Sequence, residues 1–147
     1  MKKTVILEPS YSSFHFFIYE VDESLNTVIS EAKYHETLLS KRVYSRNNVI
    51  VIATKSEFSA VPITIQVMDS NTKEIQIDKA DWDDIKEISE FEIKSGKLKL
   101  MDPPAGDFFN IDLPIGTYSL KICYGGQDSI EDDGSSRDYY LIAVYPK

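Results

Sequence analysis

The chain has 147 residues, of which 42% are hydrophobic and 27% are charged. This balance is ordinary for a globular protein and excludes a disordered chain, and the length fits a single domain spanning residues 1–147. The formal net charge of −8 argues against direct nucleic acid binding, because phosphate contacts need clustered Lys and Arg. The charge is compatible with a cationic protein partner or with a role in solubility alone.

The N-terminal segment lacks the features of a secretion signal. Its apolar run is only Val5-Ile6-Leu7 before Glu8 and Pro9 interrupt it, and no stretch approaches the ~18 apolar residues of a membrane span. We therefore expect a cytoplasmic protein that makes no membrane contact. Cys123 is the single cysteine, which excludes an intrachain disulfide and a thiolate zinc cluster, and we expect its thiol to be inert.

The first predicted element is a short helix near residues 24–39. Five apolar residues fall near helical spacing, and Asp22 or Ser24 is available as the N-cap before them; the five are Leu25, Val28, Ile29, Ala32 and Leu39. The same apolar residues would equally suit a segment that covers an open end of a β structure.

Strands are predicted along the rest of the chain. Residues 49–52 and 139–145 are apolar on both faces, as strands covered on both sides are, and we expect them to be central. Apolar and polar residues alternate most clearly around Ile65, which should be buried, and the segments that follow this pattern are 63–67, 91–93, 98–100, 109–113 and 118–124.

Turn signals separate these strands. Ser95-Gly96 predicts a tight hairpin, residues 113–116 match a type I turn in which Gly116 supplies backbone freedom, and residues 69–72 form a third turn. Short strands and frequent turns favour an antiparallel β-sandwich over alternating βαβ units. We predict a mainly β fold, an antiparallel β-sandwich with one short helix.

The sequence contains none of the common catalytic or metal-binding motifs. His35-Glu36 begins like a zinc protease motif, but Leu39 occupies the place of the second histidine. His15 lies in a strand-like run and is expected to be a surface or core residue. We predict that the protein is not an enzyme and requires no cofactor or metal.

Two acidic segments are the candidate partner-binding site. The first surrounds the only tryptophan and comprises Asp81, Trp82, Asp83 and Asp84; the second contributes Asp128, Glu131, Asp132 and Asp133. The second segment has a calcium loop's glycine at Gly134, but Ser129 and Tyr140 then stand where that loop needs Asp and Glu. Each segment is also compatible with a structural role, as a solvated connector or, for Trp82, as a core side chain.

Three stretches of the sequence carry a family resemblance. Residues 109–118 read FNIDLPIGTY and lead through a polar loop into DYYLIAV at 138–144, while SYSSF at 10–14 fits an opening strand. These stretches resemble the competence protein J family. The segments WDDIKE at 82–87 and SGKL at 95–98 also resemble many small bacterial proteins of similar layout.

The resemblance implies a function. The competence protein is the inhibitor partner of a DNA-entry nuclease, so the likeness implies a non-enzymatic inhibitor or immunity-type protein that binds a basic enzyme, a nuclease or toxin. No functional residues of that family are carried over. The alternative is a β-sandwich ligand-binding or assembly module, for which the nine tyrosines would suit a sugar-binding face.

Overall fold

The computed structural model of the chain describes residues 2–7, 15–20, 25–32, 43–46, 48–53, 61–68, 77, 81–102, 106–126 and 139–147. The elements within these residues are β1 (Lys2–Leu7), β2 (His15–Tyr19), α1 (Leu25–Ala32), β3 (Val43–Arg46), β4 (Val49–Ala53), β5 (Val61–Val67), β6 (Asp84–Ile93), β7 (Lys97–Asp102), β8 (Gly106–Asp112), β9 (Gly116–Gly125) and β10 (Tyr139–Pro146). The turn predicted at residues 69–72 lies outside the described residues.

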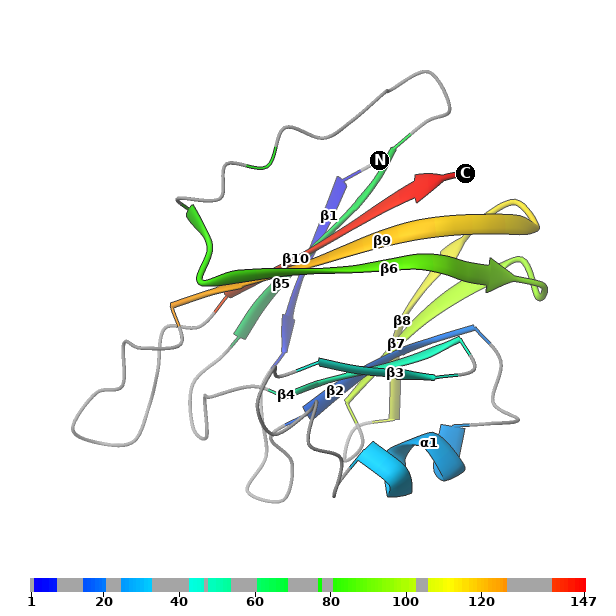
Figure 1. The fold of residues 1–147 in the computed structure, drawn as a ribbon, viewed down its shortest axis with the longest axis horizontal. Coiled ribbons are helices and arrows are strands. Elements are labelled where there is room, and N and C mark those ends of the chain that lie inside the picture. The colour runs from blue at the N-terminus through cyan, green and yellow to red at the C-terminus, as the bar shows by residue number, and fades with distance from the viewer. Residues whose placement is uncertain are drawn as a thin grey trace.

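The strands form two five-stranded sheets that pack face to face (Figure 1). Sheet A has the order β1-β5-β10-β9-β6, and sheet B has the order β3-β4-β2-β7-β8. The predicted mainly β sandwich is confirmed. Every pair is antiparallel except β5 with β10, which are parallel, so sheet A is mixed. These two strands are far apart in the sequence and no hairpin constrains their direction.

The main core fills the space between the sheets. Ile65 at the centre of β5 is 2% exposed, as the alternating pattern predicts. The prediction of two central strands is also confirmed, since β10 is the middle strand of sheet A and every residue of β4, an interior strand of sheet B, is buried. Burial of each large aliphatic side chain stabilises the fold by roughly 1.5–3 kcal/mol.

Two adjacent connections carry the chain from one sheet to the other. β6 pairs with β9 in sheet A, whereas β7 pairs with β2 and β8 in sheet B. The hairpin predicted at Ser95-Gly96 is therefore wrong: these residues form a corner, because the partner of each strand is set by packing and not by the turn. Residues 113–115 form a second corner between β8 and β9, and the Leu113 N–H donates to the Gly96 carbonyl at 2.9 Å.

A buried carboxylate holds the first corner. Glu20 follows β2 directly, is 0% exposed, and its Oε1 accepts hydrogen bonds from the backbone N–H groups of Lys94, at 2.6 Å, and of Ser95. The Ser95 hydroxyl donates to the backbone carbonyl of Glu20 at 3.1 Å. Glu20 thus ties the end of a sheet B strand to the point where β6 leaves sheet A.

The glycines at the two corners differ in backbone conformation. Gly96 has a φ of +81°, a left-handed conformation that side chains rarely adopt. The expectation that Gly116 supplies special backbone freedom is wrong, because its φ is not positive; among the described residues other than its two neighbours in the chain, no atom lies within 4 Å of the position its Cβ would occupy.

We expect Gly96→Val to lower the free energy of unfolding by about 2 kcal/mol, because a β-branched residue is strained at positive φ. Gly116→Val is the matched control and should change it by less than about 0.5 kcal/mol, since the site is exposed and open. Urea denaturation of both variants measures the difference. Equal losses would show that the glycine at the first corner is not conformationally required.

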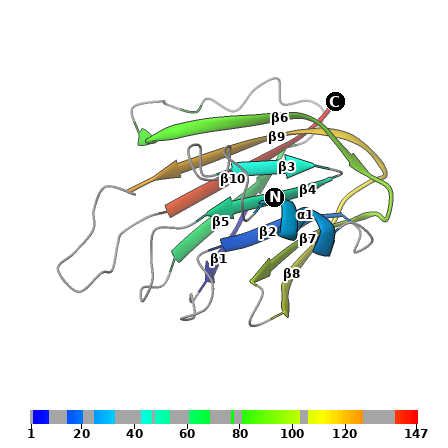
Figure 2. The same ribbon diagram turned by 60° about the horizontal axis from the view of Figure 1, so that its bottom comes forward.

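Helix α1 covers the outer face of sheet B (Figure 2). A second cluster of buried side chains lies between the helix and the sheet, where Val28 of α1 packs against Phe17, Tyr19, Tyr44, Val49, Val51 and Ala53 of the strands. Glu31 on α1 accepts a hydrogen bond from the Tyr44 hydroxyl at 3.1 Å and pairs with Arg46 at 2.6 Å. The predicted helix is confirmed for residues 25–32, where it packs on a sheet face; residues 33–39 lie outside the described part. The helix of the described chain is too short to cross a membrane.

Candidate functional site

The structure places the first predicted acidic segment at one end of an edge strand. Asp81, Trp82 and Asp83 precede β6, and Asp84 is its first residue. β6 is the outermost strand of sheet A next to β9 (Figure 1). The Asp83 N–H donates to the Tyr124 carbonyl at 2.8 Å and continues the ladder by one residue. The second predicted segment, with Asp128, Glu131, Asp132 and Asp133, lies outside the described residues.

Within this segment, Asp84 makes hydrogen bonds that stabilise the fold. Its Oδ1 accepts the Ile85 N–H at 2.8 Å, and its Oδ2 accepts the Tyr124 hydroxyl at 3.1 Å and lies 3.3 Å from the Lys86 ammonium. Partial burial raises the pKa of Asp84, but these three donors together outweigh it and leave the pKa below its usual value. Asp84 therefore orients the start of β6.

Trp82 lies at the edge of the sandwich and belongs to neither core cluster. Its half-buried ring contacts Tyr139 with centroids 5.2 Å apart, and the Tyr139 hydroxyl donates to the Asp81 carbonyl at 2.8 Å. Gly125 makes room for this contact, because a Cβ there would lie 2.6 Å from the Tyr139 ring. The hypothesis that Trp82 fills the core is wrong; an aromatic pair fixes the backbone that carries the exposed Asp81 and Asp83.

The carboxylates continue along β6 beyond the predicted segment. Glu87, Glu90 and Glu92 are exposed on the same strand. Residues 81–94 contain six carboxylates and two lysines, a net charge of −4, which is half of the −8 carried by the whole chain. The sequence did not identify these three residues as part of the site, because the acidic run becomes one surface only once Asp84–Ile93 is known to be a strand. We call residues 81–94 the acidic edge.

Both lysines of the acidic edge are already engaged. Lys86 pairs with Asp84 at 3.3 Å and Lys94 pairs with Glu92 at 3.3 Å. These exposed pairs contribute little to stability, but they neutralise the lysines of this surface and leave the net field negative.

The acidic edge is poorly suited to pairing with another strand. A bulge between Ile88 and Phe91 disrupts the ladder with β9. The Ile85 N–H is bonded to Asp84, and the Glu92 N–H donates to Asn48 Oδ1 at 3.0 Å. Bulges, charges and capped N–H groups are the usual protections of edge strands. A partner would therefore contact the side chains of β6 and not extend sheet A.

A groove of about 410 Å³ separates β6 from β3, the edge strand of sheet B. Its lining includes Val43, Arg46, Lys86 and Ile88. A hydrogen bond and the charge of Glu31 raise the pKa of Arg46, so this guanidinium stays charged and paired with the helix. The groove thus adds no free cation to the field of the acidic edge.

Cys123 is buried in β9, opposite Leu141 and Ile85 on the neighbouring strands. Burial raises the pKa of its thiol to about 11, although Lys121 acts in the opposite direction. Because the thiolate is the nucleophile, this thiol is inert at neutral pH. Among the residues that the structure describes, no three His, Cys, Asp or Glu side chains gather as a metal site requires.

We expect native protein at pH 9 to react with a thiol reagent at least about tenfold more slowly than the same chain in urea, because the folded thiol stays protonated there while an unfolded one ionises near its ordinary pKa of about 8.5. The folded state loses this protection as the pH rises toward 11. Labelling rates across this range measure the effect. Equal rates for folded and unfolded chain would contradict the burial of Cys123.

No protein-family model matches the sequence, and no curated protein matches it. Two solved structures match the fold. The crystal structure of ComJ from Bacillus subtilis, an inhibitor of the DNA degrading activity of NucA, has a TM-score of 0.64 at 14% identity, with 99% of this chain and 96% of ComJ covered. The structure called crocagin biosynthetic gene J has a TM-score of 0.51 at 11% identity, with 100% and 97% covered. The expected resemblance is thus confirmed at the level of architecture: this chain has a ComJ-like fold.

Proposed function

We propose that this protein is a non-catalytic inhibitor that binds a basic enzyme, a nuclease, through its acidic edge. The observation that carries the proposal is the net charge of −4 on residues 81–94, displayed on an exposed edge strand of a ComJ-like fold. An enzyme that acts on DNA has a cationic cleft, because phosphate binding depends on clustered Lys and Arg. A surface of fixed carboxylates is complementary to such a cleft.

The hydrogen-bonded backbone at the start of the acidic edge supports the same role. The Tyr139 contact and the hydrogen bonds of Asp84 hold the backbone at its start, so the exposed carboxylates are held in place before the partner arrives. Preorganised groups lose less conformational freedom on binding, which favours affinity. The second predicted segment, Asp128 to Asp133, is proposed as an addition to this surface.

The test begins with affinity capture from the source organism on immobilised protein. Captured nucleases are purified and their degradation of DNA is measured with increasing amounts of this protein, with NucA as a second target. We expect inhibition that saturates at one inhibitor per enzyme and weakens with salt. A variant with Asp81→Lys and Glu90→Lys reverses charge on the acidic edge and should inhibit poorly. Capture of no basic enzyme, or undiminished DNA degradation, would overturn the proposal.

A further inference from the structure

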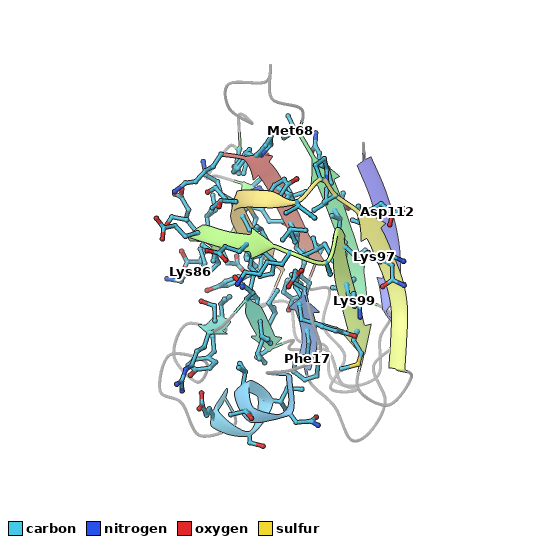
Figure 3. All side chains as sticks on the ribbon, turned by 90° about the vertical axis from the view of Figure 1, so that its right-hand side faces the viewer. Phe17, Met68, Lys86, Lys97, Lys99 and Asp112 are labelled. Atoms are coloured by element: carbon cyan, nitrogen blue, oxygen red, sulfur yellow. The ribbon has the colours of Figure 1, made fainter. Side chains whose placement is uncertain are left out.

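A second surface feature lies at the opposite end of β6 and β9 from Trp82. A pocket of about 470 Å³ opens beside the β8–β9 corner, a volume within the range of about 300–1,000 Å³ that ligand sites occupy. Its lining includes Met68, Pro114, Ile115, Thr117, Tyr118 and Lys147. Met68 is labelled at this end of the molecule in Figure 3.

The walls of the pocket are held by hydrogen bonds within the fold. The Met68 N–H donates to the Val144 carbonyl at 2.8 Å, and the Lys147 N–H donates to the Thr117 carbonyl at 3.0 Å. The Tyr118 hydroxyl donates to the Pro114 carbonyl at 2.6 Å. The pocket is therefore formed before anything binds.

Its chemistry is mainly aliphatic. Ile115 is 73% exposed, although it belongs to a residue type that is usually buried. Burial raises the pKa of Tyr118, so its hydroxyl stays neutral and bonded to Pro114. Lys147 supplies the one charged side chain of the lining, and the methylene stem of a lysine can itself cover apolar surface.

The pocket is continuous with the acidic edge. Glu92 lies directly opposite Thr117 in the ladder, and Thr117 lines the pocket. Tyr124 and Gly116, at the two ends of the shared ladder, are about 26 Å apart at roughly 3.3 Å per residue. A standard interface of about 800 Å² per partner is about 32 Å across, so one partner can cover both features.

We propose, on the basis of the function proposed above, that this pocket receives an aliphatic side chain of the same cationic partner. Charged side chains at the rim of an interface act chiefly on the association rate, whereas apolar side chains buried near its centre set the dissociation rate. The carboxylates of the acidic edge raise the association rate of the partner, and the pocket beside Ile115 lowers its dissociation rate. Glu92, which the ladder places opposite Thr117 at the edge of the pocket, favours an occupant segment in which a cationic residue stands next to the aliphatic one.

Two measurements test this assignment. First, tert-butanol is titrated into isotopically labelled protein, and amide shifts are expected to saturate and to cluster at Ile115, Thr117 and Lys147. This arm needs no partner and is independent of the proposed function. Shifts spread evenly over the surface would overturn the pocket as an apolar binding site.

Second, association and dissociation rates with the captured nuclease are compared for wild type, Ile115→Ser and Ile115→Leu. We expect Ile115→Ser to dissociate about tenfold faster with an unchanged association rate and salt dependence, and Ile115→Leu to behave as wild type. An unchanged dissociation rate would overturn the inference and leave the inhibitor function standing. Self-association in sedimentation that Ile115→Ser abolishes would assign the pocket to a second copy of the chain and also overturn it.

Discussion

Glu20→Ala is expected to lower the free energy of unfolding by about 3 kcal/mol. The substitution removes the acceptor of two backbone N–H groups at the β6–β7 corner, and a protein hydrogen bond contributes about 0.5–1.5 kcal/mol net, or about 1.5–3 kcal/mol where the acceptor is charged. Glu20 is 0% exposed, so its removal also leaves a cavity. A loss of this size is a large share of a typical stability of about 5–15 kcal/mol.

Urea denaturation of three variants isolates this role. Glu20→Gln keeps one side-chain oxygen and should lose roughly half as much, while Glu90→Ala removes an exposed carboxylate and should change stability by less than about 0.5 kcal/mol. Amide exchange of Lys94 and Ser95 should accelerate in Glu20→Ala more than exchange in β4. If Glu20→Ala matches Glu90→Ala, the corner does not depend on the buried carboxylate.

The fold was predictable where one face of a strand is buried and the other is wet. That condition holds around Ile65 and in the first part of β9, up to Lys121, and the alternation in the sequence found both; from Ile122 to Gly125 both faces of β9 are buried. It fails in β3, whose two buried residues are followed by two exposed ones, and over the first part of β6, an edge strand with little covered surface. The corner at Gly96 shows a further limit, because a local turn signal does not reveal which sheet the next strand joins.

The candidate site was predictable only in part for a related reason. The acidic residues around Trp82 are consecutive in the sequence and can be recognised there. Glu90 and Glu92 are recognised as part of the same surface only because β6 is exposed at the edge of sheet A. Tyr139 is 57 residues beyond Trp82 in the sequence, so their ring contact is a product of tertiary structure. Glu20 looks like a strand-ending surface residue, and nothing near it in the sequence indicates burial.

Reversal of charge on the acidic edge is expected to slow association with the captured nuclease by at least about tenfold at low salt, because steering by complementary charge raises association rates by factors of about 10–10³. The variant combines Asp81→Lys with Glu90→Lys, two exposed positions on the edge. The rate should also lose most of its dependence on salt. The dissociation rate should change less, since rim charges act mainly before contact.

One control makes the result specific to this surface, and a further variant tests the second predicted segment. Asp112→Lys on β8 changes the charge by the same amount as Glu90→Lys, but Asp112 lies on the opposite side of the sandwich from Lys86 of β6 (Figure 3) and should leave the association rate nearly unchanged. Asp132→Lys with Asp133→Lys matches the charge change of the edge variant and tests the second predicted segment. Circular dichroism verifies that each variant is folded. Equal slowing by Asp112→Lys and Glu90→Lys would mean that net charge, and not the acidic edge, governs the encounter with the partner.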